Sequence, residues 1–377
     1  MIYLDNAATT RLTEPVLEVM LPFLTSEYAN PSAVYGSARR AGSAVERARE
    51  QCAALIAAEP GEIVFTGSGT ESDNWVLRSA LLLTGKRRIV TTKIEHHAIL
   101  RCCEQLEREG AAVTWLDADP EGIVSPESVR EALTDDTALV SVMTANNEIG
   151  SIQPIREIGG ICRERGVLFH TDAVQAYGHI PLDVGEMNVD FLSASAHKLH
   201  GPKGAGLLYI RKGIALPPLL FGGAQEDGRR AGTSNTAGIA GFGKAAEMAG
   251  EGMAEKSVRI TALRDSLVRR ILKEIPGSSL NGHPVKRLPG NVNVSFAGIS
   301  GSELLTLLDG QGICASTGAA CSSSSGKPSH VLTAVGKSRT RANGAIRLSL
   351  SEETTREEVD AAFRALKESV AALSMLN

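Results

Sequence analysis

The chain has 377 residues, a formal net charge of −4 at pH 7 and 43% hydrophobic residues. This length exceeds what one hydrophobic core usually supports, so we expect two domains. The slightly negative charge argues against a nucleic-acid-binding or polybasic membrane surface, and no apolar run reaches the length of a membrane span. The N-terminus has no basic region followed by an apolar run, so we expect a cytoplasmic protein without a signal peptide.

Short apolar runs alternate with helical patterns through the first part of the chain. Strands are predicted over 62–66, 88–92, 138–144, 166–172, 189–195 and 204–210, and helices over 72–83, 97–110 and 155–165. This alternation indicates parallel βαβ units, and the nearly continuous apolar character of the runs indicates burial on both faces. The predicted fold is α/β, with a mostly parallel central sheet covered by helices.

The last third of the chain has the pattern of a smaller α+β domain. A helical pattern runs from Ala237 to Ile275 and stops at Pro276 and Gly277. Residues 291–298 and 345–350 alternate like half-buried strands, and a final amphipathic helix is predicted over 355–375. We predict a large domain over 15–255 and a small domain made of 1–14 and 256–377.

Polar residues follow the predicted strands, where ligands of open α/β sheets bind. Gly69 and Thr70 follow the strand 62–66 at the start of a helix, where free N–H groups and the helix dipole suit a phosphate. An ordinary glycine turn with an N-cap explains the same residues about equally well. A dinucleotide fingerprint is incomplete, because Ser72 stands in the place of its third glycine.

The next three strand ends each carry a candidate group with a plain structural alternative. His96 could stack on a flat ring or simply face solvent, and Asn147 lies in a cluster that is commonly a turn. Asp172 ends the strand 166–172, with Gln175 close behind. A carboxylate there is costly without a cationic partner, although it could instead cap the following helix.

The strand 189–195 is followed by a lysine among small residues. Ser195, His197 and Lys198 lie there, so the strand ends together supply a phosphate cradle, a ring-stacking group, a buried anion and an amine. Pyridoxal 5'-phosphate needs this set, with the carboxylate for its pyridinium N–H and the lysine for a Schiff base. Lys198 is the predicted Schiff-base lysine. Lys203 is the competitor, and a solvated surface lysine is the plain alternative.

The six cysteines show no zinc-type spacing. Cys52, Cys162 and the adjacent pair 102–103 lie in helical patterns, where small buried free thiols are expected. Cys321 differs, because it lies in the loop sequence STGAACSSSSGKPS. A thiol in such a loop can be a nucleophile, and an incidental exposed cysteine is the alternative.

These motifs together resemble those of the pyridoxal-phosphate-dependent cysteine desulfurases, in the class V aminotransferase group of fold type I. The matching segments, in family order, are YLDNAATT (3–10), NPSA (30–33), FTGSGTESDN (65–74), EHHA (95–98), NNEIG (146–150), HTDAVQ (170–175), SASAHKLHGPKG (193–204), RAGTSN (230–235), STGAACS (316–322) and AIRLSL (345–350). The resemblance implies conversion of L-cysteine to L-alanine, with the sulfur left as a persulfide on Cys321. No deletion is evident after Cys321, which is similar to the long-loop members that donate sulfur to iron–sulfur scaffolds and tRNA-thiolation enzymes.

The resemblance also implies a role for each matching residue. Lys198 holds the cofactor and moves protons, Asp172 pairs with the ring nitrogen, and His96 stacks on the ring and acts as an acid or base. The other implied contacts are Gln175 to the ring oxygen, Gly69, Thr70, Ser195 and His197 to the phosphate, Thr233 to the phosphate of the partner subunit in a homodimer, and Asn147 and Arg347 to the substrate. No metal is implied, except that Cys321 could transiently hold an iron–sulfur cluster.

Four other functions remain open on the sequence. A selenocysteine lyase or a class V aminotransferase would share the cofactor, and the aminotransferase would not need Cys321. A non-catalytic sulfur-relay or scaffold protein could keep the fold, and an absorbance band of bound cofactor would argue against it. A nucleotide-binding dehydrogenase is a more distant alternative, because its fingerprint is incomplete.

Overall fold

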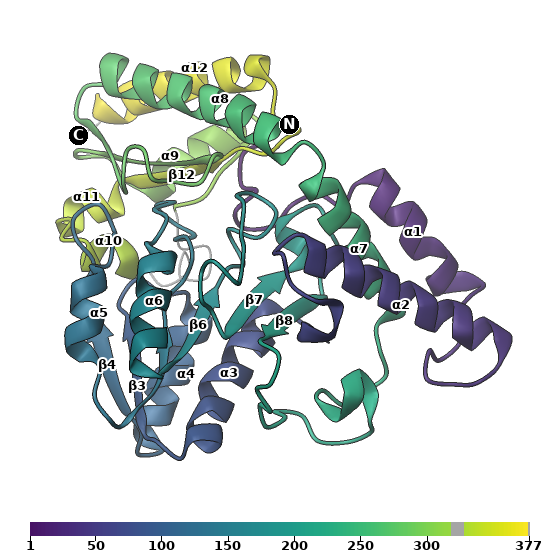
Figure 1. Ribbon diagram of the computed structural model, residues 1–377. Coiled ribbons are helices and arrows are strands. Elements are labelled where there is room, and N and C mark those ends of the chain that lie inside the picture. Colours follow the sequence, from purple (N-terminus) through teal and green to yellow (C-terminus); the bar gives the residue numbers. More distant parts are fainter. Residues whose placement is uncertain (318–327, 376–377) are drawn as a thin grey trace.

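A seven-stranded sheet forms the centre of the computed structural model, which describes residues 1–317 and 328–375 (Figure 1). The strands lie in the order β2-β8-β7-β6-β5-β3-β4. They are β2 (Ile63–Thr66), β3 (Arg88–Thr92), β4 (Ala112–Leu116), β5 (Thr137–Ser141), β6 (Leu168–Asp172), β7 (Phe191–Ser195) and β8 (Gly206–Ile210). The predicted α/β fold with a mostly parallel sheet is therefore confirmed.

One strand departs from the parallel arrangement. β8 pairs antiparallel with both β7 and β2. Only residues 196–205 connect β7 to β8, and they include no more than the 3-10 turn η2 (Ala196–Lys198). A parallel connection needs a crossover of a dozen or more residues, usually a helix, so this short link favours an antiparallel return.

Helices cover both faces of this sheet, as the continuous apolar runs predicted. Neighbouring residues of one strand enter different hydrophobic clusters, with Val90 and Val140 in one and Ile89 and Leu139 in the other. The helices of this body are α1 (Glu14–Thr25), α2 (Gly36–Ala54), α3 (Gly69–Thr84), α4 (His97–Arg108), α5 (Pro126–Ala132), α6 (Ile155–Arg165) and α7 (Thr236–Gly250), and the 3-10 turns are η1 (Pro60–Glu62) and η3 (Gln225–Gly228). Of these, α1, α2 and α5, with the strand β4, were not predicted.

A second body lies above the carboxyl ends of the large sheet (Figure 1). Its antiparallel sheet has the order β12-β10-β9, with β9 (Ser278–Leu280), β10 (Asn291–Phe296) and β12 (Ala345–Ser349). Its own hydrophobic cluster includes Leu4, Leu267, Phe296, Leu304 and Leu366. The further elements are β1 (Ile2–Tyr3) paired with β11 (Ile313–Cys314), and α8 (Met253–Glu274), α9 (Gly301–Gly310), α10 (His330–Ala334), α11 (Arg339–Asn343) and α12 (Arg356–Ser374). The exact domain boundaries stay a prediction.

The helical pattern predicted over 237–275 corresponds to two helices in the structure. α7 ends at Gly250 and α8 begins at Met253. Gly252 between them has a φ of 61°, a left-handed conformation that glycine adopts without steric cost. No helix within residues 1–317 and 328–375 is long and apolar enough to cross a membrane.

The strands predicted over 291–298 and 345–350 are present as β10 and β12, but their predicted half-burial is wrong. β10 and β12 are buried along their whole length, because their polar side chains face the large body. Asn293 donates through Nδ2 to the Glu148 carbonyl at 3.0 Å, and Arg347 donates through a terminal nitrogen to the Asn147 carbonyl at 2.8 Å. The polar positions of these strands therefore form the contact between the two bodies.

Candidate active site

A cavity of about 290 Å³ lies where the carboxyl ends of the large sheet meet the second body. Both bodies and the N-terminal segment contribute to its wall. It is lined by Ala7, Ala8, Ser68, Gly69, Thr70, Asp73, His96, His97, Met143, Ala145, Asn147, Glu148, Asp172, Val174, Gln175, Ser195, His197, Lys198, His330 and Arg347. The structure thus brings together ten of the sequence-predicted site residues.

One end of the cavity is the start of α3. Ser68 caps this helix, and its hydroxyl accepts a hydrogen bond from the Glu71 N–H at 3.1 Å. A Cβ on Gly69 would lie 2.6 Å from Cγ2 of Val174, so only glycine leaves room for this close packing. The backbone N–H groups of this first helical turn, with the Thr70 and Ser195 hydroxyls beside them, are donors suited to an anion.

Asp172 ends β6 at the floor of the cavity. Its Oδ1 accepts the Val174 N–H at 2.9 Å. Burial raises the pKa of Asp172 to about 6, while this hydrogen bond and the charge of Lys198 act in the opposite direction. The carboxyl group is thus mainly an anion at neutral pH and is suited to pair with a cationic N–H.

Lys198 reaches the cavity from η2, directly after β7. Its Nζ donates to the carbonyl oxygens of Ala7 at 2.7 Å and Ala8 at 2.8 Å. Gln175 donates to the same Ala7 carbonyl at 2.9 Å. Lys203, the competing lysine, is exposed and does not line the cavity, so the geometry favours Lys198 as the amine of this site.

His96 lies at the N-cap of α4. Its Nδ1 accepts the Ala98 N–H at 3.2 Å, and because a backbone N–H only donates, the neutral ring must carry its proton on Nε2. Burial, together with the nearby charge of Lys198, lowers the pKa of His96 to about 4. At neutral pH the ring is therefore uncharged, with an N–H available to donate.

The side of the cavity towards the second body carries the groups predicted to bind the substrate. Arg347 lies on β12, is 2% exposed, and forms an ion pair of 2.8 Å with Oδ1 of Asp5. Asn147 lies beside it, and its Oδ1 is buried without a hydrogen-bond partner among the residues that the structure describes. A fixed guanidinium next to an amide is a good binding site for an amino-acid carboxylate.

Glu148 and His330 line the cavity but were not predicted as site residues. The Ser329 hydroxyl donates to Glu148, and the His330 ring stacks on His97 with 4.7 Å between ring centres. Glu148 follows Asn147 in the predicted NNEIG segment, so the position of this acid was a usable signal. His330 reaches the cavity through tertiary packing, and no local pattern in the sequence indicated it.

Two predicted site residues remain to be placed. Thr233 is exposed and does not line the cavity, so its predicted contact with a partner subunit stays a prediction. Cys321 lies outside the described residues. The five described cysteines are free thiols, and Cys52, Cys102, Cys103 and Cys162 are buried as predicted.

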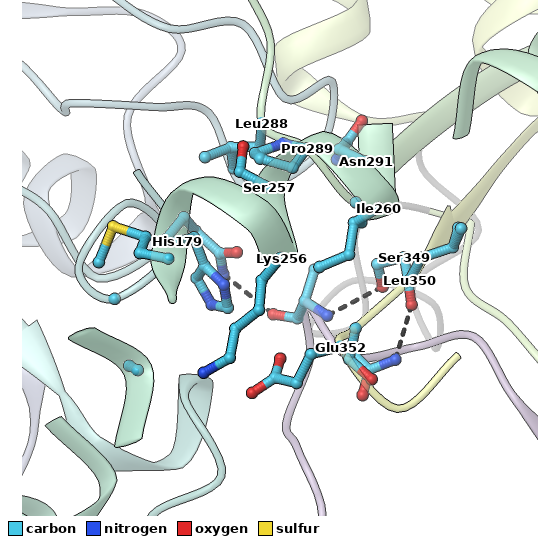
Figure 2. Close-up of a pocket in the computed structure, with 18 residues that line it drawn as sticks. His179, Lys256, Ser257, Ile260, Leu288, Pro289, Asn291, Ser349, Leu350 and Glu352 are labelled. Atoms are coloured by element: carbon cyan, nitrogen blue, oxygen red, sulfur yellow. Dashed lines mark hydrogen bonds between the residues drawn. The ribbon is translucent and has the colours of Figure 1, made fainter. Parts of the chain in front are cut away.

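A second cavity of about 60 Å³ lies on the other side of the N-terminal segment and shares Ala7 and Gln175 with the first. Figure 2 shows its lining, which includes His179, Lys256 and Glu352. This volume has room for a few water molecules only. The larger cavity, with Lys198 and Asp172, is therefore the candidate active site.

The comparisons with known proteins agree with this geometry. The family model described as aminotransferase class V matches residues 2–362. The chain belongs to this family. It is 50% identical to the cysteine desulfurase IscS of Methanosarcina thermophila over 98% of this chain and 92% of that protein, and 47% identical to a cysteine desulfurase of a Nostoc species over 100% and 94%. The predicted cysteine desulfurase family is confirmed.

Solved structures of this family have the same fold. A NifS-like protein superposes with a TM-score of 0.93 at 40% identity, covering 99% of this chain and all of that one. The structure of SspA in complex with cysteine superposes with a TM-score of 0.81 at 36% identity, covering 94% of this chain and all of that one. The cysteine desulfurase fold therefore extends over both bodies.

Proposed function

We propose that this chain is a pyridoxal-phosphate-dependent cysteine desulfurase that converts L-cysteine to L-alanine and collects the sulfur on Cys321. The observation that carries the proposal is the single cavity that holds Lys198, Asp172, His96 and Arg347. The family supports it, since relatives that match nearly the whole chain are named cysteine desulfurases. A class V aminotransferase would use the same cofactor set but would not need Cys321.

The cavity fits pyridoxal 5'-phosphate by the chemistry of its donors. The first turn of α3, with Thr70, Ser195 and His197, would hold the phosphate. Asp172 would hold the pyridinium N–H and Lys198 the aldehyde carbon. Gly69, at this end of the cavity, packs against Val174 more closely than a residue with a Cβ could.

The bound cofactor supplies an electron sink that allows the Cα proton of the substrate to leave and weakens its Cβ–S bond. Arg347 and Asn147 bind the substrate carboxylate and so orient Cα towards Lys198. The Lys198 amine then takes the Cα proton and later returns it. His96, whose ring is neutral at pH 7, donates its Nε2 proton or receives one at the face of the substrate.

Sulfur transfer proceeds by attack of the Cys321 thiolate on the sulfur of the substrate. An S–S bond forms, the Cβ–S bond breaks, and the electron pair of that bond becomes a C–H bond of alanine. One L-cysteine and one Cys321 thiol thus yield one L-alanine and one Cys321 persulfide, with no external oxidant. A sulfur acceptor protein, either an iron–sulfur scaffold or a tRNA-thiolation enzyme, would then receive the sulfur.

A cytoplasmic homodimer is part of the same proposal. Thr233 is exposed outside the cavity of its own subunit, which is compatible with a contact to the phosphate of the partner subunit. The free thiols of the described cysteines suit a reducing compartment.

The test is incubation of the purified protein with L-cysteine, followed by measurement of alanine and of protein-bound persulfide. We expect both products from the wild type and neither at a comparable rate from Cys321→Ala. Undiminished alanine formation by the variant would contradict the assigned role of Cys321. Absence of a pyridoxyl label on Lys198 after borohydride reduction would contradict the cofactor site.

A further inference from the structure

Asp73 is a second carboxyl group in the wall of the candidate active site. It lies in the first half of α3 and is 1% exposed. Its Oδ1 has no hydrogen-bond partner in the part of the chain that the structure describes. A buried carboxylate without a cation or a full set of donors is strongly disfavoured, so the charge state of Asp73 needs an explanation.

The histidine next to Asp73 does not supply a positive charge. Nε2 of His170 lies 3.6 Å from Oδ1 of Asp73, but the ring is fully buried between two hydroxyls. Its Nδ1 lies 2.9 Å from the Ser141 hydroxyl and its Nε2 lies 3.0 Å from the Ser193 hydroxyl. Burial lowers the pKa of His170 to about 3, so the ring is neutral at pH 7.

The other titratable groups around Asp73 are acids. Burial raises the pKa of Asp73 most, and repulsion by Asp172 and Glu95 raises it further. A hydrogen bond with the Ser193 hydroxyl acts on this pKa in the opposite direction. The Cys102 thiol, whose pKa burial raises to about 11, is neutral. The ammonium group of the cavity, Lys198, lowers the pKa of Asp172.

The two aspartates differ in their stabilising contacts. Asp172 accepts a backbone N–H and experiences the charge of Lys198, whereas Asp73 has a neutral hydroxyl, that of Ser193, and an oxygen without a partner beside a neutral imidazole. Two close carboxyl groups in a low-dielectric site do not both ionise, and the proton stays on the one whose anion is less stabilised.

We propose that Asp73 is a protonated, neutral carboxylic acid at pH 7, and that it acts as a positioning residue that leaves the negative charge on Asp172. The inference deepens the proposed function, because Asp172 is the group that would hold the cofactor nitrogen. The side chain of Asp73 occupies space near Asp172 without adding a second negative charge to the site. Asn should therefore replace it well, since an amide has the same shape and no charge.

The decisive measurement is infrared difference spectroscopy on the cofactor-free protein. The carbonyl stretch of a protonated acid should be present in the wild type at pH 7 and lost in Asp73→Asn. Glu95→Gln, at another buried acid of this region, is the matched control. The absorption spectrum of this variant should still contain the Asp73 band. A wild-type minus Asp73→Asn spectrum without this band would overturn the proposal.

A measurement on the wild type alone tests whether the proton lies on His170 instead of Asp73. Nitrogen NMR of the wild type should show the His170 ring as a neutral imidazole at pH 7. A His170 imidazolium would mean that the proton lies on the ring and that Asp73 is an anion, which would overturn the proposal.

Stability of the cofactor-free protein supplies a further readout. A carboxyl group with a raised pKa in the folded state holds a proton that the unfolded chain releases above a pH of about 4. It therefore destabilises the fold progressively as the pH rises from there. The midpoint of thermal unfolding of Asp73→Asn should increase relative to the wild type between about pH 4 and pH 7, and a constant difference would contradict the proposal.

Cofactor binding separates this inference from the proposed function. Asp73→Asn should bind pyridoxal phosphate within about threefold of the wild type at pH 7, because the charge of the site is unchanged. A large loss of affinity would show that the negative charge of Asp73 is needed and would overturn the inference. A missing label on Lys198 in the wild type would instead defeat the proposed function, while the infrared result would stand.

Discussion

The two walls of the active-site cavity are built in different ways. The wall from the large body consists of residues that follow consecutive strands, among them His96, Asp172 and Lys198. The wall from the second body depends on contacts between distant segments, such as Arg347 with Asp5 and with the Asn147 carbonyl. The first wall is fixed by sheet topology, and the second by how the two bodies pack together.

Substitutions in the two walls should therefore have different effects on the enzyme. Changes in the first wall should abolish the chemistry while leaving substrate affinity and folding largely intact. Changes in the second wall should weaken substrate binding or the contact between the bodies. The following experiments are ordered by the size of the expected effect.

Replacement of the amine should have the largest effect. Lys198→Ala removes the group that both holds the cofactor and transfers the proton, so alanine formation should fall about 10³-fold or more. Turnover of L-cysteine to alanine measures the effect. Lys203→Ala, at an exposed lysine outside the cavity, is the matched control and should keep wild-type turnover. Equal losses in both variants would remove the distinction between these lysines.

The buried anion of the first wall should make cofactor affinity dependent on pH. Because the pKa of Asp172 is about 6, affinity of the cofactor-free protein should decrease as the pH falls through this value and Asp172 becomes neutral. Asp172→Asn should lose about 30- to 1000-fold in affinity at pH 8 and show a flatter profile. Titration of pyridoxal phosphate by fluorescence between about pH 5 and pH 8 measures both. An unchanged profile in the variant would assign the titration to another group.

The guanidinium of the second wall should affect substrate binding more than chemistry. Arg347→Lys keeps the charge but loses the planar fork that matches a carboxylate, so KM for L-cysteine should rise about 10- to 100-fold with a smaller change in kcat. Steady-state kinetics measures this split. Arg339→Lys, at an exposed arginine of α11, should leave KM unchanged. A fall in kcat alone would mean that Arg347 acts in the chemical step.

The contact between the two bodies should give the smallest effect on activity. Asn293→Ala removes a buried hydrogen bond to the Glu148 carbonyl and one from Asn281, which should reduce the free energy of unfolding by about 1–3 kcal/mol. Urea unfolding monitored by fluorescence measures it. Thr306→Ala, on an exposed helix position, should stay within about 0.5 kcal/mol of the wild type. An unaffected Asn293→Ala would imply that the bodies associate mainly through apolar contacts.

The same difference explains how far the sequence could predict this molecule. Apolar runs such as 88–92 and 166–172 revealed the central strands, and the residues after them revealed the first wall, because strand ends converge at one edge of a sheet. The burial of β10 and β12 was not predictable, since alternation cannot distinguish a face in water from a face packed on a polar surface. His330 was not predicted either, because it reaches the cavity only through packing between distant segments.

The two carbonyl groups that hold the Lys198 amine belong to residues 7 and 8, close to the start of the chain. Residues 2 and 3 are paired with β11 of the second body, so this short segment is secured at one end there and meets the lysine at the other. For protein engineering, this makes the first ten residues part of the reaction centre, although they contain none of its reactive side chains. Affinity tags are better fused after α12, and a version of the large body produced alone should be supplied with this segment as a peptide.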